Sequence, residues 1–324
     1  MKLDKIIEPV KGNLAEFDEY YNSQFQSKIP LLNMILKYMA RRGGKKIRPS
    51  LVFLTANLFG EITKRAYTGA AMIELLHTAT LVHDDVVDNA NERRGFLSIN
   101  AIWKNKIAVL IGDFLLSKGL LIAVETNEFE FLKVTSSSVQ KMSEGELLSM
   151  ESSRKMKYSE ELYYEITKGK TAVLLRACCE IGAIAQKQPQ EVIEKMGEFG
   201  ELLGMAFQII DDVFDYTKSN YLIGKPVGND IKEKKITLPL LMAFRNAQKS
   251  EIESIIKKIK NGKLNKKEVT DIIEFVKEKS GVEAAKLKAE EYIQNAIEIL
   301  KEFENVQAKE TLIDFANFII QRDK

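Results

Sequence analysis

The chain of 324 residues is long enough to bury a large hydrophobic core, in one domain or two. Its 48 Lys and Arg residues nearly balance 46 Asp and Glu residues, and the net charge of +2 gives no electrostatic case for nucleic-acid binding. The first residues, MKLDKIIEPVKG, are charged and lack the apolar core of a secretory signal, which favours a cytoplasmic protein.

The N-terminal part of the chain is predicted to be helical. Apolar residues recur at helical spacing from Leu3 to Tyr38, and a break at 27–30 predicts two helices. The basic segment RRGGKKIRPS predicts a turn, and Pro49 suits the first turn of a helix over 49–59. By itself this basic turn is typical of a solvated loop, although Gly-Gly-Lys before a helix start also suits an anion site.

The next predicted helix, from about residue 63 to residue 88, ends in the motif DDVVD. If its end is regular, Asp88 lies four residues after Asp84 and three residues after Asp85, so the three carboxylates share one side. Three negative charges at such short separations repel one another. Mg²⁺ is the cation best suited to offset them, because it prefers oxygen ligands and shares its coordination shell with substrate phosphates.

The same acidic spacing recurs further along the chain. Asp211, Asp212 and Asp215 repeat it in FQIIDDVFD, again after an apolar helical run. A single copy would be typical of a solvated acidic helix end, whereas two copies on apolar helices indicate metal sites. Arg93 and Arg94 follow the first copy, and guanidinium groups present a planar fork of donors to phosphate oxygens. The two copies therefore predict magnesium together with a diphosphate.

The remaining segments also favour helices. These are predicted over 101–124, 128–153, 158–186, 189–216 and 237–246, followed by three lysine-rich amphipathic helices. A glycine between two lysines at 167–171 indicates a kink that exposes backbone carbonyls and brings Lys170 near a site. The segment 217–233 has the strongest loop signal, contains Lys225, and is suited to act as a lid.

The chain as a whole is predicted to be all-α, with about a dozen helices in a single domain over 1–324. No stretch alternates with a period of two for long enough to indicate a sheet. The most apolar run, 107–124, contains Asp113 and Lys118, which makes it a poor membrane span. Cys178 and Cys179 are adjacent, cannot form an ordinary disulfide, and are interpreted as core residues.

Five segments together resemble the motifs of the trans polyprenyl diphosphate synthases. They are GGKKIRP, LVHDDVVDNANERRG, KGKTA, FQIIDDVFDY and GKPVGNDIKEKKITLPLL. The resemblance implies the isoprenoid synthase fold, which is a large helical bundle around a central apolar cavity. It also implies a homodimer, Mg²⁺ as the cofactor, and two substrates, isopentenyl diphosphate and an allylic diphosphate such as farnesyl or geranylgeranyl diphosphate.

The resemblance assigns roles to single positions of this sequence. It implies that the metal ligands are Asp84, Asp88, Asp211 and Asp215, with Asp85 and Asp212 completing the catalytic motifs. It implies that the isopentenyl diphosphate head group is bound by Lys45, Arg48, His77 and Arg94. It implies that the allylic diphosphate is held by Arg93, Lys170 and Lys225, and that Lys235 is the family's lysine before Thr-Leu-Pro. It implies that the oxygens facing the developing cation belong to Thr171 and Gln208. One departure is Lys234, where the family usually has glycine.

The implied reaction is ionisation of the allylic diphosphate, attack by the double bond of isopentenyl diphosphate, and loss of a proton. No side-chain base is required, in keeping with a chain that has two histidines. The resemblance favours substrate binding as the role of His77 over a buried structural role, whereas His83 is expected to orient a carboxylate.

Product length is predicted from the helix before the first acidic motif. One helical turn of ~5.4 Å is about one isoprene unit, so residues one and two turns before Asp84 act as a ruler. Ala79 and Thr80 are small and let the growing tail pass. We therefore expect a long-chain product of roughly six to nine units by family analogy. The residues expected to set its deeper limit are Leu76, Leu116 and Leu120.

Several alternatives stay open at this point. They are a farnesyl or geranylgeranyl diphosphate synthase, a subunit of a heteromeric synthase, a class I terpene cyclase, a noncatalytic helical subunit, and an acidic helical binding module. Noncatalytic subunits typically lose aspartates, and both acidic motifs are intact here, whereas an acidic binding module leaves the coincidence of five motifs unexplained. The sequence is compatible with transient membrane contact for product release, although no segment requires it. The allylic primer and the use of the product, for example in quinone side chains, are open.

Overall fold

The computed structural model describes residues 3–25, 27–40, 46–93, 95–217, 228–262, 264–304 and 306–322. Helices account for 83% of the structure, which confirms the all-α prediction. The chain divides into two compact units, one formed by 1–139, 174–200 and 301–315, and the other by 140–173, 201–300 and 316–324. The single domain expected over 1–324 stays a prediction, and each unit is described by itself.

The first unit contains the N-terminal helices and one short hairpin. Its complete elements are α1 (Leu3–Ile6), η1 (Glu8–Val10), α2 (Lys11–Ser23), α3 (Pro30–Ala40), α4 (Ile47–Leu58), α5 (Lys64–Val87), β1 (Glu92–Arg93), β2 (Phe96–Leu97) and α6 (Ile99–Glu125). It also includes parts of α7 (Phe129–Lys155), α9 (Val173–Ala185), α10 (Gln190–Thr217) and α16 (Val306–Gln321). These bounds confirm the predicted helices from α3 onward to within a few residues. The first predicted helix is instead divided into α1, η1 and α2.

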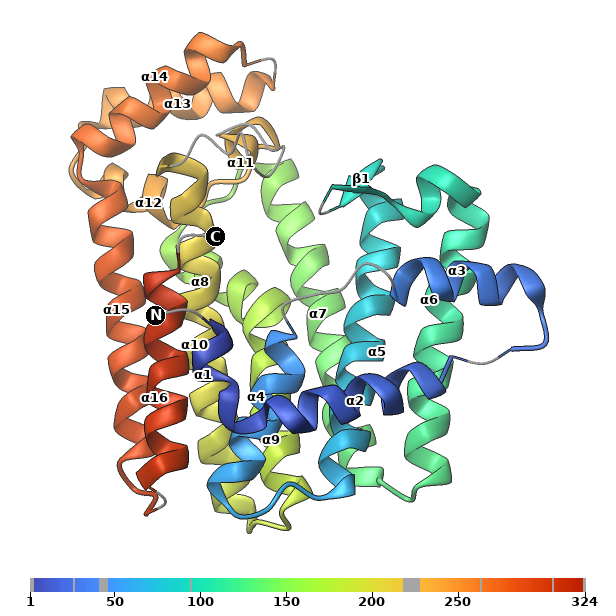
Figure 1. The fold of residues 1–324 in the computed structure, drawn as a ribbon. Helices are drawn as coiled ribbons and strands as arrows, with labels where there is room; N and C mark the ends of the chain where they lie inside the picture. The colour runs from blue at the N-terminus through green and yellow to red at the C-terminus, as the bar shows by residue number, and fades with distance from the viewer. Residues whose placement is uncertain are drawn as a thin grey trace. The chain divides into compact units, whose positions relative to one another are not determined.

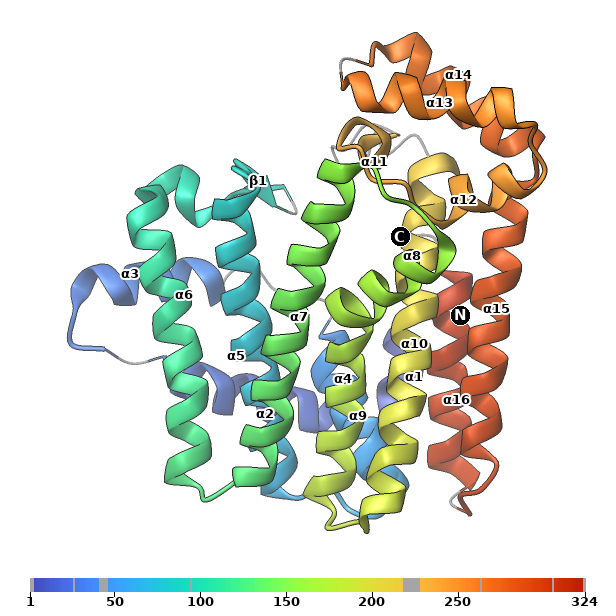
Figure 2. The same cartoon turned by 180° about the vertical axis from the view of Figure 1, so that it is seen from behind.

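Helix α5 is central to the first unit and lies beside α6 along most of its length (Figures 1 and 2). It begins after Thr63 and ends before Asp88, as predicted. Small residues allow its neighbours to approach closely. A Cβ on Gly69 would overlap the side chain of Ile181 on α9, so only glycine fits there without a shift. This packing fixes the direction in which the end of α5 presents its aspartates.

Helix α6 buries one side against α5 and exposes an apolar stripe on the other. Its exposed apolar residues are Ile102, Val109, Leu110, Leu120, Leu121 and Val124. From Val109 to Val124 they fall within an arc of about 120°, at 100° per residue. By length and composition α6 is the one helix in the described ranges that could cross a membrane, and 33% of that stretch is buried. The same length and composition are found in core helices of soluble proteins.

Two short elements differ from the predicted pattern in the first unit. The polar segment after α5 forms a hairpin in which Glu92 lies opposite Leu97, and Arg93 lies opposite Phe96. Each strand has only two residues, too few to produce a period-two signal in the sequence. Within α6 the backbone kinks at Lys104, where φ is 72°.

The second unit contains the remaining helices. Its complete elements are α8 (Glu160–Thr167), η2 (Lys168–Ala172), α11 (Asn229–Lys232), α12 (Leu238–Arg245), α13 (Lys249–Asn261), α14 (Lys266–Glu278) and α15 (Gly281–Leu300). The prediction of three helices after α12 was wrong, because α13, α14, α15 and α16 follow it. Helix α13 ends with Gly262 as its C-cap, and a capping box between Asn265 and Glu268 fixes the start of α14.

The break predicted at 167–171 is a π-helical turn, η2, that joins α8 to α9 without interrupting the helical path. π-Turns widen a helix locally and frequently occur at functional sites. Gly169 lies against Gly145 of α7, and a Cβ on Gly145 would stand 2.8 Å from the backbone nitrogen of Lys170. The glycines let α7 and η2 pack backbone to backbone, which fixes the position of Lys170 and Thr171.

Candidate active site

The first acidic motif does not present its three carboxylates on one side. Asp85 is 3% exposed, and its Oδ1 accepts a hydrogen bond from Nε of Arg93 at 2.6 Å. Its backbone carbonyl accepts a second bond from Asn100 Nδ2 at 3.1 Å. The prediction of a shared face was therefore wrong for Asp85, which points into the first unit and holds the hairpin to α5. The bond to Asp85 uses one of the five N–H donors of Arg93.

Asp84 and Asp88 are more exposed to solvent than Asp85 in this motif. Asp84 is half-buried and Asp88 is exposed at the end of α5, where its backbone N–H bonds to the carbonyl of Asp84. In the ranges that the structure describes, no three His, Cys, Asp or Glu side chains converge as a metal cluster. Mg²⁺ does not require such a cluster, because it commonly takes one or two carboxylates and completes its shell with phosphates and water. The donors at this helix end fit that ion.

The predicted isopentenyl diphosphate pocket is described in part. Arg48 is half-buried in the first turn of α4, and His77 is buried on α5, which packs against α4. Burial raises the pKa of the Cys178 thiol to about 12. The positive charge of Arg48 opposes this shift and the negative charge of Glu74 adds to it, so Arg48 and Glu74 both lie near Cys178. Two further residues of this predicted pocket, Lys45 and Arg94, lie outside the described residues.

In the second acidic motif, Asp211 is paired with an arginine from the C-terminal helix segment. Arg322 Nη2 donates to Asp211 Oδ1 at 2.6 Å and to the carbonyl of Phe207 at 2.8 Å. Its guanidinium also lies 3.7 Å from the centre of the Phe207 ring. The side chain of Arg322 is 7% exposed, whereas that of Asp211 is 42% exposed. Asp211 is thus oriented from one side while its carboxylate reaches the surface.

Asp212 is buried and held by two donors. Tyr163 Oη donates to Asp212 Oδ2 at 2.7 Å, and Gln208 Nε2 donates to Asp212 Oδ1 at 2.8 Å. Thr171 Oγ1 in turn donates to Gln208 Oε1 at 2.8 Å. Burial raises the pKa of Asp212 well above its ordinary value, Asp230 adds to the shift, and the bonds from Tyr163 and Gln208 oppose it. The structure therefore brings together three predicted residues, Thr171, Gln208 and Asp212.

Asp215 caps the short helix α11. Its Oδ1 accepts from the backbone N–H of Asn229 at 3.1 Å, and its Oδ2 accepts from that of Asp230 at 3.0 Å. Burial raises the pKa of Asp215, and these backbone bonds oppose the shift. A metal bound at Asp215 would share the carboxylate with these backbone amides. The role of Asp215 as a metal ligand stays a prediction.

The predicted lysines of the second unit are paired with acids. Lys170 bonds to Glu146 of α7, and Lys235 bonds to Glu233 at 2.6 Å. Lys225 and most of the predicted lid lie outside the described residues. Lys234 has φ at 61°, a left-handed conformation that glycine adopts without strain, which explains why glycine suits this position. Its Nζ donates to the carbonyl of Lys260, at the end of α13.

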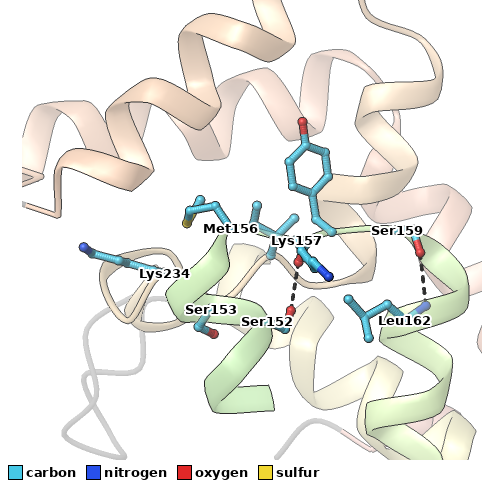
Figure 3. Close-up of a pocket in the computed structure, with 9 residues that line it drawn as sticks. Ser152, Ser153, Met156, Lys157, Ser159, Leu162 and Lys234 are labelled. Carbon is cyan, nitrogen blue, oxygen red and sulfur yellow. Dashed lines mark hydrogen bonds between the residues drawn. The ribbon is translucent and has the colours of Figure 1, made fainter. Parts of the chain in front are cut away.

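A small depression beside Lys234 belongs to the turn between α7 and α8 (Figure 3). Its volume of about 30 Å³ holds roughly one water molecule. Ser152 Oγ donates to the carbonyl of Lys157 at 2.8 Å, and Ser159 Oγ accepts from the backbone N–H of Leu162 at 3.2 Å. These bonds close the turn and cap α8, so the depression has a structural explanation.

A larger, mostly apolar cavity of about 220 Å³ lies within the first unit. Its lining residues are Met72, Leu76, Leu116, Gly119, Leu120, Thr135, Ser136 and Val139. Three predicted chain-length residues therefore meet at one cavity, from α5 and α6. Ala79 does not line it and is fully buried, and Thr80 Oγ1 bonds to the carbonyl of His77 at 2.9 Å. Leu120 and Ser136 are exposed, so the cavity is open toward the surface.

Some residues of these sites were not found from the sequence. Tyr163 and Arg322 contact the second motif from 49 and 111 residues away, and neither belongs to a recognisable spacing. Asp230 lies within the motif GKPVGNDIKEKKITLPLL, and this motif was the sequence signal that could have identified it as a site residue. His83, expected to orient a carboxylate, lies 3.5 Å from Asp113 of α6 and 3.2 Å from the carbonyl of Val109.

Comparisons with known proteins extend over the whole chain. A family model described as polyprenyl synthetase matches residues 29–276. The all-trans-nonaprenyl-diphosphate synthase (geranyl-diphosphate specific) of Rhodobacter capsulatus is 35% identical over 98% of this chain and 97% of that protein. The octaprenyl diphosphate synthase of Escherichia coli is 33% identical over 100% of both chains. A solved polyprenyl synthase from Caulobacter crescentus, complexed with calcium and isoprenyl diphosphate, has a TM-score of 0.92 and 30% identity, covering 100% of this chain and 98% of that one.

Proposed function

The chain belongs to the polyprenyl synthetase family, and from this premise we propose that it makes a long-chain all-trans polyprenyl diphosphate with Mg²⁺ as its cofactor. It is a prenyltransferase with the isoprenoid synthase fold. The proposed substrates are isopentenyl diphosphate and an allylic primer, farnesyl or geranylgeranyl diphosphate.

The proposed reaction breaks the C–O bond between the allylic carbon and its diphosphate. A C–C bond then forms to the terminal alkene carbon, C4, of isopentenyl diphosphate, which places the positive charge on C3. C2 loses a proton to the released diphosphate, and the C2–C3 double bond forms. Lys170, Lys225 and Arg93 would bind the allylic diphosphate and offset its growing charge. Lys45, Arg48, His77 and Arg94 would bind the head group of isopentenyl diphosphate, and Lys235 would assist at the allylic group.

The oxygens available in the acidic motifs support magnesium as the cofactor. Asp84, Asp88 and Asp211 offer carboxylates that are at least partly accessible, and Asp215 would contribute a shared one. Bound magnesium would neutralise charge on the departing diphosphate. Asp85 and Asp212 are buried, and their contacts support positioning roles within the catalytic motifs.

The single observation that carries the long-chain assignment is the cavity beside α5. It is lined by Leu76, Leu116 and Leu120, the residues expected to limit product growth, and it is largely apolar. Ala79 and Thr80, at the first turn before Asp84, have small side chains, and a growing tail can pass them. The named activities of the R. capsulatus and E. coli relatives, nonaprenyl and octaprenyl synthesis, support the same length class.

The test is a product-length assay of the purified chain alone, with labelled isopentenyl diphosphate, farnesyl diphosphate and Mg²⁺. Products longer than five isoprene units are expected. A product that stops at four units would assign the chain to the geranylgeranyl synthases instead. Absence of extension of farnesyl diphosphate would fit either a farnesyl synthase or a subunit that requires a different partner chain, and a second assay primed with geranyl diphosphate separates these two, because only the farnesyl synthase would extend it.

A homodimer is the proposed assembly, and the exposed stripe on α6 supports it. Apolar stripes of this length rarely stay exposed in soluble monomers. The mass in solution should be twice 36.8 kDa, measured by light scattering. Leu110→Asp with Leu121→Asp should give the single-chain mass, because two charges would enter an apolar contact. A single-chain mass for the unmodified protein would contradict the assembly.

The proposed location is the cytoplasm, with transient membrane contact when the product leaves. A polyprenyl chain of the proposed length is insoluble in water, and quinone side chains are one use for it. Within the described residues, the membrane-length helix α6 contains Asp113 and Lys118, which argues for a surface contact over a span.

A further inference from the structure

In the second unit, Tyr163 is connected by hydrogen bonds to two residues that are expected to face the reacting allylic carbon. It lies on α8, is 8% exposed, and its ring packs edge-on against Tyr164 at 5.6 Å. Its hydroxyl donates to Asp212, which begins a chain of hydrogen bonds through Gln208 to Thr171. We call these four residues the Asp212 network. Tyr163 has no role in the proposed reaction so far.

The direction of every bond in this network follows from its first member. Burial and the nearby Asp212 carboxylate raise the pKa of Tyr163 well above its ordinary value, so the phenol keeps its proton and donates it. Tyr163 Oη donates to Asp212 Oδ2 and Gln208 Nε2 donates to Asp212 Oδ1, so the amide of Gln208 turns its NH₂ group toward Asp212. Its Oε1 then faces Thr171, and the threonine hydroxyl donates to it at 2.8 Å.

The consequence is a defined pair of oxygens at the π-turn. With Thr171 donating its hydrogen to Gln208, the lone pairs of both oxygens remain available toward the substrate. If the amide of Gln208 were reversed, it would present N–H hydrogens instead, and these would repel a carbon that becomes positively charged. Removing the Tyr163 hydroxyl leaves a buried carboxylate oxygen without this donor, which permits Asp212 to rotate and Gln208 to reverse.

We propose that Tyr163 is a positioning residue whose hydroxyl, through Asp212, fixes the oxygens of Gln208 and Thr171 toward the reacting allylic carbon. The role rests on the proposed function, because the network matters for rate only if an allylic cation forms beside it. This role differs from a contact that only holds α8 against α10. Loss of such a contact would lower the stability of the protein, and its effect on kcat would not depend on the presence of Thr171.

The experiment is a double-mutant cycle with the full chain, Mg²⁺, farnesyl diphosphate and isopentenyl diphosphate. Tyr163→Phe keeps the ring and removes only the hydroxyl. It should lower kcat about tenfold, the usual effect of losing a hydrogen bond to a charged group. KM for isopentenyl diphosphate should change by less than about twofold, because the head-group residues are untouched. Tyr164→Phe is the matched control, since Tyr164 is adjacent and its described contacts are with the Tyr163 and Tyr292 rings; its kcat should stay within about twofold.

The decisive measurement is whether the effects of Tyr163→Phe and Thr171→Val on kcat depend on each other. Thr171→Val removes one of the two oxygens that the network orients and also the donor that holds Gln208 Oε1, so adding Tyr163→Phe should lower kcat by clearly less than the tenfold expected in the unmodified chain. Independent, multiplying losses would overturn the proposal. Should Tyr163→Phe fail to fold, Asp212→Ala removes the acceptor of the same bond and must show the same coupling to Thr171→Val.

Failure of the proposed function would look different. If the unmodified chain released no diphosphate with any primer, both proposals would fall together. If it were active and the losses multiplied, only the role of Tyr163 would be wrong. A neutron crystal structure of Tyr163→Phe adds a readout besides rate, because it distinguishes the amide nitrogen from the oxygen, and Gln208 should then have reversed or lost its bond to Thr171. An unchanged Gln208 would contradict the positioning role.

Discussion

Replacing Gly119 with leucine should shorten the product by about one isoprene unit, estimated from the ~5.4 Å rise per turn and the size of the cavity. Gly119 lines the cavity within the first unit, between the predicted limiting residues Leu116 and Leu120. A Cβ at this position would meet only Leu75 Cβ, at the ordinary contact distance of 3.9 Å. The α6 backbone therefore accommodates a side chain that enters the cavity.

The magnitude follows from the cavity volume of about 220 Å³. A cavity of roughly 150 Å³ holds a benzene molecule, so this one has room for about nine carbons. A leucine side chain contributes four carbons, leaving room for about five, one isoprene unit less than the unmodified cavity. The substitution should not harm folding, because leucine is favoured over glycine within a helix by up to about 1 kcal/mol.

The assay is chromatography of dephosphorylated products from labelled isopentenyl diphosphate and farnesyl diphosphate. Gly119→Ala is the control, because alanine favours the helix equally and leaves most of the cavity open. It should give the length distribution of the unmodified chain. An unchanged distribution for Gly119→Leu, with normal turnover, would show that the growing tail does not enter this cavity and would refute the reasoning.

Four further outcomes are expected. Ala79→Tyr should shorten the product more strongly, at a stability cost of about 1–3 kcal/mol since Ala79 is fully buried; unchanged length by the same chromatography would contradict the ruler. Asp84→Asn should lower kcat at least about 100-fold at saturating Mg²⁺, measured by diphosphate release, because it removes charge stabilisation of the leaving group; a loss below tenfold would argue against metal binding there. Arg322→Gln should destabilise the fold by about 1–3 kcal/mol in urea unfolding, since it removes charged hydrogen bonds and a stacked guanidinium, and a neutral effect would contradict the importance of the Asp211 pair. Iodoacetamide should label neither cysteine of the native chain at pH 8, because burial raises the pKa of Cys178 to about 12 and that of Cys179 well above its ordinary value, and the thiolate is the reactive form; both should react in guanidinium, and rapid native labelling would contradict their burial.

The sequence predicted the helices well because their signals are local. Apolar residues at helical spacing, Pro49 and Thr63 at helix starts, and the glycine between lysines in KGKTA each act within one or two turns. The structure gives α4, α5 and the π-turn η2 at these places. The last part of the chain was less predictable, since α13 and α14 are separated by only a short loop.

The orientation of the aspartates was not determined by the sequence. Helical periodicity fixes the angles between Asp84, Asp85 and Asp88 but not the direction of the core. Packing of α5 against α6, together with the bond from Arg93, turns Asp85 inward and leaves Asp84 and Asp88 more open. The side of the motif that receives a ligand is therefore a property of the packed helices.

By itself, the sequence determined the all-α class, the family, and the residue types of the two acidic motifs. Only the tertiary structure decided which residues support those motifs. Tyr163 reaches Asp212, and Arg322 reaches Asp211, across 49 and 111 residues of chain, distances at which no spacing pattern carries information. The cavity beside Leu76 was likewise decided by packing, because its walls are contributed by three helices whose register against one another is set by long-range contacts.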